Sequence, residues 1–318
     1  MKIGWIAPFM GEVGGIRSIV ETGNCIKYLG HEFYIITKQK YHKPSWIDCE
    51  PSLITIEEAK AIGLDAVVNQ DPFCNGWEKE IPSKLKILHH CSAYLNCVDH
   101  MIEDYDFITT CFKRGFNHFY RNFNKEIFFV GQGVKSSQFS FKEERRLDGS
   151  VYYCCRAFNL GNDQKGSVTT HKLLLPLKDK YKINCWDNTT DSAPKEFKFT
   201  QVTQEINRKS YAEHIYHQAD VVVTLDKVSA WNCIAGEAMS SGTPVISNGE
   251  GLEDYGIPGY NYLLLEDFSS ETLSKNIDKL IKDIDYRKEI VRNASNTMKE
   301  FTWLKVAERL IHVIERKL

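Results

Sequence analysis

Short apolar runs typical of β-strands alternate along this chain with segments of helical periodicity, and this alternation constrains the fold most. The run 219–225, Ala-Asp-Val-Val-Val-Thr-Leu, is apolar on both faces, as is typical of a strand inside a parallel sheet. Further strands are expected at 2–7, 33–37, 66–68, 87–88, 106–110, 127–130, 151–155 and 183–186. We therefore expect an α/β protein in which helices cover parallel sheets.

The pattern is interrupted at 131–134, where Gly-Gln-Gly-Val opens a polar stretch that runs to about Gly149. A chain of 318 residues is long enough for two domains of ordinary size. We expect two Rossmann-like domains, residues 1–135 and 136–300, with a ligand cleft between them. The tail is helical, and its last helix, 301–318, is expected to pack back on the N-terminal domain.

The segment 236–247, Gly-Glu-Ala-Met-Ser-Ser-Gly-Thr-Pro-Val-Ile-Ser, has the clearest local pattern. Pro244 blocks further helix and the small residues allow close backbone approach, so a helix, a tight turn and a strand are expected. The helix is expected to start near Ala230 and to carry Glu237 two turns later. Backbone N–H groups at its start can bind phosphate oxygens, whereas the carboxylate can bind sugar hydroxyls or pair locally.

Composition argues against several classes of protein. A formal net charge of −2 disfavours a strong, non-specific binder of nucleic acid or anionic membranes. No apolar run approaches the ~20 residues of a membrane span, and the N-terminus lacks the apolar length of a signal peptide. The ten cysteines include no Cys-x-x-Cys pair, so free thiols in a reducing cytoplasm are expected. His89-His90-Cys91 suggests a metal cluster, but neighbouring strand residues point to opposite faces.

Two short motifs lie where strands are expected to end. Gly14-Gly15 falls between the first strand and the first helix, where glycines let the backbone approach a phosphate or sugar, or simply form a tight turn. Arg156 ends the strand 151–155, and Lys165-Gly166 precedes the next helix. Two cations beside a helix start suit a diphosphate, with solvated loop charges as the alternative interpretation.

In their order and spacing, these motifs resemble the retaining glycosyltransferases of family four, which have the GT-B fold of two Rossmann-like domains with parallel sheets facing a central cleft. The resemblance rests on the opening Gly14-Gly15-Ile16-Arg17, Leu29-Gly30-His31-Glu32-Phe33, the linker-like 130–134, the Cys155-Arg156 and Lys165-Gly166 pair, 229–239 over the E-x7-E region, and Phe301-Thr302-Trp303. The chain departs from the family pattern at four positions. Ser229 replaces the first glutamate of E-x7-E, Asn232 replaces a glycine, Gln132 replaces the linker asparagine, and Glu250 stands near a usual Gly-Gly.

The resemblance implies a set of site residues. The implied catalytic residues are His90, Arg156 and Lys165, and the implied substrate-binding residues are Gly14, Gly15, His89, Ser229, Asn232, Cys233 and Glu237. Arg156 and Lys165 would hold the donor diphosphate, Glu237 would hold the ribose, and the glycine pair would close over diphosphate and sugar. The family histidine matches either His89 or His90, and we favour His90, which ends an apolar strand, as the residue over the donor sugar.

The function implied is transfer of a hexosyl or pentosyl group from a nucleotide diphosphate sugar, UDP- or GDP-linked, with retention and without metal or cofactor. Two alternatives are a hydrolysing sugar-nucleotide epimerase of the same fold and, prompted by Ser229, a non-catalytic partner of another transferase. The acceptor stays open between a glycan, a lipid-linked sugar, a small molecule and a nucleic-acid base. The segment 112–121 mixes cations with aromatic residues, which suits peripheral membrane contact, base stacking or a half-buried helix with a basic outer face.

Overall fold

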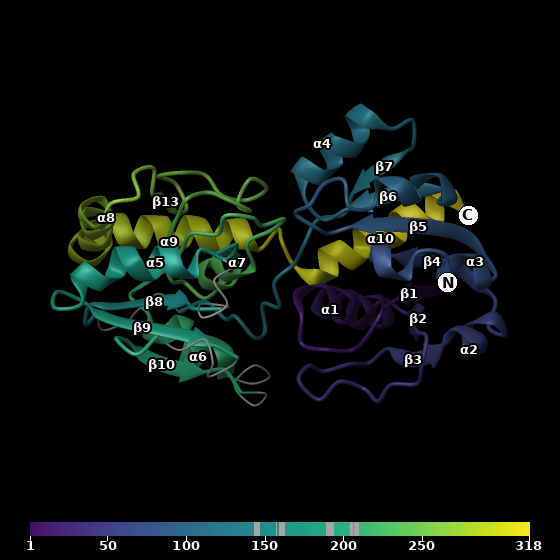
Figure 1. Ribbon diagram of the computed structural model, residues 1–318, viewed down its shortest axis with the longest axis horizontal. Helices are drawn as coiled ribbons and strands as arrows, with labels where there is room; N and C mark the ends of the chain where they lie inside the picture. Colours follow the sequence, from purple (N-terminus) through teal and green to yellow (C-terminus); the bar gives the residue numbers. More distant parts are fainter. Residues whose placement is uncertain (143–146, 157, 159–162, 189–193, 204–205, 207–209) are drawn as a thin grey trace. The chain divides into compact units, whose positions relative to one another are not determined.

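The computed structural model describes residues 1–318 except 143–146, 157, 159–162, 189–193, 204–205 and 207–209. The chain divides into a first unit, residues 1–133 with 301–318, and a second unit, residues 134–300. Each unit is built on one parallel sheet (Figure 1), which confirms the expected α/β class. The polar stretch expected before Gly149 includes 143–146, which lie outside the described residues.

The sheet of the first unit has the strand order β3-β2-β1-β4-β5-β6-β7. The chain adds strands β2 and β3 on one side of β1 and then strands β4 to β7 on the other side. The direction of winding therefore reverses between β1 and β4. At such a switch point the loops leave the sheet in opposite directions, and their carboxyl ends form a natural ligand site. The strands are β1 (Lys2–Ile6), β2 (Glu32–Thr37), β3 (Ser52–Thr55), β4 (Leu64–Asn69), β5 (Ser83–His90), β6 (Phe107–Thr110) and β7 (Ile127–Phe129).

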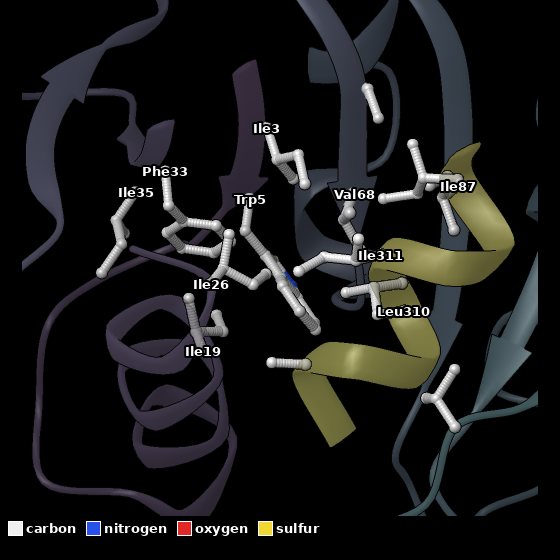
Figure 2. Close-up of a cluster of buried hydrophobic side chains, with 14 of the residues drawn as sticks. Ile3, Trp5, Ile19, Ile26, Phe33, Ile35, Val68, Ile87, Leu310 and Ile311 are labelled. Carbon is white, nitrogen blue, oxygen red and sulfur yellow. The ribbon is translucent and has the colours of Figure 1, made fainter. Parts of the chain in front are cut away.

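Helices cover both faces of this sheet because its strands alternate apolar side chains between the faces. Figure 2 shows Trp5 of β1 packed between Ile19 and Ile26 of the first helix and Leu310 and Ile311 of the last. The opposite face packs against the other helices. The helices are α1 (Gly14–Tyr28), α2 (Ile56–Lys60), α3 (Trp77–Glu80), α4 (Lys113–Asn122) and α10 (Trp303–Lys317).

The sheet of the second unit has the order β10-β9-β8-β11-β12-β13, so its switch point lies between β8 and β11. Val221, Val222 and Val223 of the central strand are buried, as their continuous apolar run predicts. The strands are β8 (Ser150–Cys154), β9 (Lys182–Asp187), β10 (Lys198–Gln201), β11 (Val221–Thr224), β12 (Val245–Ser247) and β13 (Leu263–Leu264).

Helices of the second unit begin close to where the sequence places them, with one informative shift. The helix expected from about Ala230 starts at Cys233, because Asn232 caps it by accepting the backbone N–H of Ala235 at 3.0 Å. Within the described ranges, every helix is too short or too polar to span a bilayer. The helices are α5 (Ser167–Leu174), α6 (Tyr211–His214), α7 (Cys233–Ser240), α8 (Ser270–Lys282) and α9 (Ile284–Met298).

Candidate functional site

Arg156 lies at the switch point of the second sheet, two residues beyond the end of β8. Its backbone is fixed by the first residue of α5, since the Ser167 hydroxyl donates to the carbonyl of Arg156 at 2.7 Å and lies 3.3 Å from that of Cys154. The Arg156 side chain is exposed. A guanidinium is thus presented to solvent from a well-anchored turn beside a helix start, as an anion site requires.

Lys165 is brought to the same edge by a turn that locks onto the end of β11. Gly166 has φ +62°, and a Cβ there would collide with the carbonyl oxygen of Leu225, so only glycine fits. The carbonyl of Gln164 accepts the backbone N–H of Lys227 at 2.8 Å. Because these contacts join the loop before α5 to the loop after β11, Arg156 and Lys165 both belong to the switch point.

The Lys165 ammonium contacts a carboxylate that the sequence analysis did not single out. Its Nζ lies 3.1 Å from Oδ2 of Asp226, whose side chain is 3% exposed. Burial raises the pKa of Asp226, and the ammonium of Lys165 opposes that rise. The sequence signal for this pair was the position of Asp226, directly after a buried apolar run. The carboxyl ends of parallel strands meet at one edge of a sheet, so a residue at this position lies near the loops that follow the neighbouring strands.

The loop before α7 is held by the segment that follows β12. The backbone N–H of Ser229 donates to Oε1 of Glu250 at 3.0 Å, and that of Asn232 donates to the carbonyl of Gly251 at 2.9 Å. Ser229 and Asn232 are both buried. The backbone N–H groups of Ser229 and Asn232 therefore already donate hydrogen bonds within the protein. Fewer backbone N–H groups of this loop are left for a ligand.

Glu237 lies on α7 and is buried. Its Oε2 accepts the hydroxyl of Tyr216, itself fully buried, at 2.7 Å. The partner is 21 residues away in the sequence rather than local, and the role of Glu237 toward the donor stays a prediction. Cys233, the first residue of the same helix, is half-buried.

Gly14 and Gly15 lie at the switch point of the first sheet, but inside the helix. The sequence placed them in the loop before it, whereas they are the first two residues of α1, preceded by Val13, which makes no side-chain cap. Gln70, just after β4, donates through Nε2 to the carbonyl of Gly15 at 3.1 Å. The two glycines extend the helix by about half a turn, and a Cβ on Gly15 would lie 3.1 Å from Nε2 of Gln70.

His89 and His90 end β5, one strand beyond the switch point, and point to opposite faces of the sheet. The ring of His89 packs edge-on against Trp5, with centroids 5.0 Å apart, and its Nδ1 lies 2.9 Å from Thr109 Oγ1. The ring of His90 packs against Phe119 of α4 at 4.9 Å. Only one of the two can therefore face any given ligand, as strand geometry requires.

Both histidines are buried and neutral near pH 7. Burial lowers the pKa of His89 to about 3 and that of His90 to about 4. The carbonyl of Tyr94 accepts from His90 Nε2 at 3.4 Å, which leaves Nδ1 as an acceptor. Within the described part of the chain, neither this Nδ1 nor Oγ1 of Thr110, its register neighbour on β6, has a hydrogen-bond partner. Two polar atoms without described partners thus lie buried at adjacent strand ends.

Comparison with known proteins places these features in a family context. Residues 198–297, which lie in the second unit, match the family described as glycosyl transferases group 1. A stretch of 82 residues is 37% identical to an uncharacterized glycosyltransferase of Methanocaldococcus jannaschii. That stretch covers 25% of this chain and 21% of the relative, so the chain matches about a fifth of the relative's length.

Solved structures match over nearly the whole chain. Anabaena HepE in complex with UDP and glucose aligns with TM-score 0.75 and 11% identity, covering 99% of each chain. Sucrose-phosphate synthase from Thermosynechococcus elongatus aligns with TM-score 0.78 and 13% identity, covering 99% of this chain and 98% of that one. The protein therefore has the GT-B fold of these structures, and its second unit contains a segment, 198–297, that matches the group 1 glycosyl transferase family.

Proposed function

We propose that the protein transfers a sugar from a nucleotide diphosphate sugar to an acceptor with retention of the anomeric configuration. The observation that carries this proposal is that Arg156 and Lys165 both stand on loops at the switch point of the second sheet, in the unit whose residues 198–297 match the group 1 family. Negative charge grows on the leaving diphosphate as the glycosidic bond breaks. Fixed cations aimed at that charge supply the electrostatic stabilisation that usually dominates catalysis.

A UDP-sugar is the first donor to test and a GDP-sugar the second. Anabaena HepE, whose fold this chain shares, has been solved in complex with UDP-glucose. We propose that Asn232 and Cys233 at the start of α7 contact the diphosphate, that Glu237 contributes to the ribose site, and that Ser229 lies near the donor sugar. The first unit would receive the acceptor, with Gly14, Gly15 and His90 touching the substrates.

We further propose that turnover needs no divalent metal ion and no cofactor, because Arg156 and Lys165 already supply positive charge for the diphosphate. Activity should therefore survive EDTA treatment, and loss of activity that magnesium or manganese restores would contradict the proposal. A cytoplasmic location is consistent with ten cysteines that are all free thiols.

The acceptor side offers one feature that favours a membrane-associated substrate. Phe116 and Tyr120 stack on α4 with centroids 5.8 Å apart, Tyr120 is 70% exposed, and Arg121 follows on the same helix. Aromatic and basic side chains on one helix suit the interface of an anionic membrane. If the protein floats with anionic vesicles and Tyr120→Ser abolishes this flotation, a lipid-linked acceptor is supported. If the wild-type protein does not float with the vesicles, a dissolved acceptor is favoured.

The decisive experiment is a thermal-shift panel of nucleotides and nucleotide sugars followed by product analysis. A ligand at about 100 times its Kd adds roughly 2.7 kcal/mol to the free energy of unfolding, which such a panel detects. Products formed from the stabilising donor without any acceptor would indicate the epimerase alternative. Binding without turnover of any donor would indicate the non-catalytic partner, and absence of binding would refute the donor assignment.

A further inference from the structure

The contact between Lys165 and Asp226 sets the charge of the proposed diphosphate site. The ammonium keeps one N–H on the Asp226 carboxylate at 3.1 Å, and its side chain is still 44% exposed. An ammonium has three N–H donors, so two remain for phosphate oxygens. Asp226 need not release Lys165 when an anion arrives, and its own negative charge stays beside that anion.

A second carboxylate strengthens this effect. Glu250, held by the backbone N–H of Ser229, lies close enough to raise the pKa of Asp226 further. The loops of Lys165 and Asp226 are joined by the Gln164–Lys227 backbone bond and by the ion pair between Lys227 and Asp163 at 2.7 Å. The segment that carries Glu250 is tied to Asp226 by the amide of Asn248, which donates to the Asp226 carbonyl at 2.7 Å. The carboxylates therefore cannot easily withdraw, and any bound diphosphate must tolerate them.

We propose that Asp226 is a counter-charge to Lys165 which weakens binding of the free nucleoside diphosphate more than binding of the nucleotide sugar. The inference rests on the proposed function, because it assumes that Lys165 contacts the diphosphate. It makes Asp226 a specificity-determining residue that acts on the charge of the ligand beside Lys165 and favours release of the product over loss of the donor.

The physical reason is the difference in charge between the two ligands. A terminal phosphate has a second pKa near 6, so a free nucleoside diphosphate carries about three negative charges at pH 7.5, whereas its sugar ester carries about two. Repulsion by a fixed carboxylate scales with the ligand's charge. At about 6 Å, in a water-like dielectric near 80, one unit of charge amounts to roughly threefold in affinity.

The test compares Asp226→Asn with the wild-type chain by calorimetry, with UDP and UDP-glucose as probes. Asparagine keeps the shape and one acceptor oxygen while removing the charge. We expect UDP to bind roughly tenfold more tightly in the variant and UDP-glucose roughly threefold more tightly, as screened repulsion predicts. Equal tightening of both probes would overturn the discrimination, and weaker binding of both would show that Asp226 serves only to hold Lys165.

A matched control is Asp278→Asn, which removes the charge from another lysine–aspartate pair of the same unit, Lys180–Asp278 at 2.8 Å. That pair lies near the amino end of β9, at the opposite edge of the sheet, so both Kd values should stay unchanged. GDP and GDP-mannose serve as the second pair of probes. If the wild-type chain binds neither pair, the donor assignment fails and this inference with it, whereas binding without the predicted contrast refutes the inference alone.

A pH titration gives a readout that does not depend on how well the variant folds. The groups that act on Asp226 are Lys165, Ser229 and Glu250, and Asp226 in turn acts on Cys154 and Tyr255. Protonation of Asp226 removes its charge, so wild-type affinity for UDP-glucose, whose phosphates do not titrate here, should rise about threefold as the pH falls. Glu250→Gln should keep this rise, and a flat or falling wild-type profile would contradict the inference.

Discussion

The two sheets of this protein present the same topological position with different side chains. At the switch point of the first sheet stand Gly14, Gly15 and Gln70, and the nearby His90 is buried and neutral. At the switch point of the second sheet stand an exposed Arg156 and the Lys165–Asp226 pair. Both sheets are parallel and both reverse their winding between two central strands.

This difference teaches that the fold supplies a place for a ligand, whereas a few side chains decide which ligand suits it. A charged edge with two cations matches a diphosphate. An edge with neutral donors and acceptors matches hydroxyl groups, which need hydrogen bonds without net charge. If the charged edge binds the diphosphate and the neutral edge binds hydroxyl groups, substitutions at the two edges should have separable effects on affinity and on turnover.

The largest effect is expected at the neutral edge. His90→Ala should lower kcat by roughly 10²–10³-fold, the cost of removing one preorganised hydrogen-bonding group from a reacting centre. UDP affinity, measured by calorimetry, should stay within about twofold because the charged edge is intact. His89→Ala is the matched control, being a buried histidine on the same strand that faces the other side. A larger loss in the His89 variant would move the role to that residue.

Acid should destabilise the first unit through the same histidines. Their folded pKa values, about 4 for His90 and about 3 for His89, lie below the ordinary 6.5, so the unfolded chain binds the protons first. The contribution of these histidines to the free energy of unfolding is fully present above pH 6.5. It is lost as the pH drops toward 4, and His90 alone accounts for roughly 3 kcal/mol of the loss. Urea unfolding at pH 7.5 and 4.5 measures this loss. The loss should shrink in His90→Gln, and an unchanged loss would show that other groups cause it.

At the charged edge, Arg156→Ala and Lys165→Ala should each weaken UDP or GDP binding by about 1.5–3 kcal/mol, the worth of a charged hydrogen bond. Lys165→Ala should cost more, since it also leaves the buried Asp226 without its partner. Calorimetry measures both. Lys180→Ala, which breaks the pair at the opposite edge of the sheet, should leave the affinity unchanged. Unchanged affinity in both site variants would refute the diphosphate assignment.

The smallest effect is expected for Ser229→Ala. The backbone N–H of Ser229, rather than its side chain, holds Glu250, so the variant keeps the loop before α7 in place. The hydroxyl that is lost donates a hydrogen bond to Asp226 and is proposed to lie near the donor sugar, and we expect KM or sugar preference to change by about 1 kcal/mol or less. UDP affinity should not change. A loss of UDP affinity as large as that in Arg156→Ala would place Ser229 at the diphosphate instead.

Much of the fold could be predicted because periodicity is a local property. The apolar run at Val221–Thr224 is a central buried strand, as expected, and the alternation of strands and helices gives the parallel sheets. The strands β3, β10 and β13 escaped because they are only four, four and two residues long, too short to show a clear period. The start of α7 was placed three residues early because a side-chain cap at Asn232, rather than apolar spacing, sets it.

The site was predicted less completely, for a different reason. Arg156 and Lys165 stand out in the sequence as cations near strand ends, but the partner of Lys165 is 61 residues away and only the sheet order brings it close. The same holds for Glu237 and Tyr216, which are 21 residues apart and meet through a buried hydrogen bond. Distant pairs of this kind leave no local pattern.

The sequence by itself determined the α/β class, the parallel sheets and the residues that carry charge or a neutral ring, because these follow from side-chain chemistry and from spacing along the chain. Tertiary structure decided which of those residues meet. It buried Asp226 against Lys165 and packed His89 against Trp5 and His90 against Phe119. Strand order and burial are set by the packing of segments far apart in the chain, and burial in turn fixes the charge state of the groups at each sheet edge.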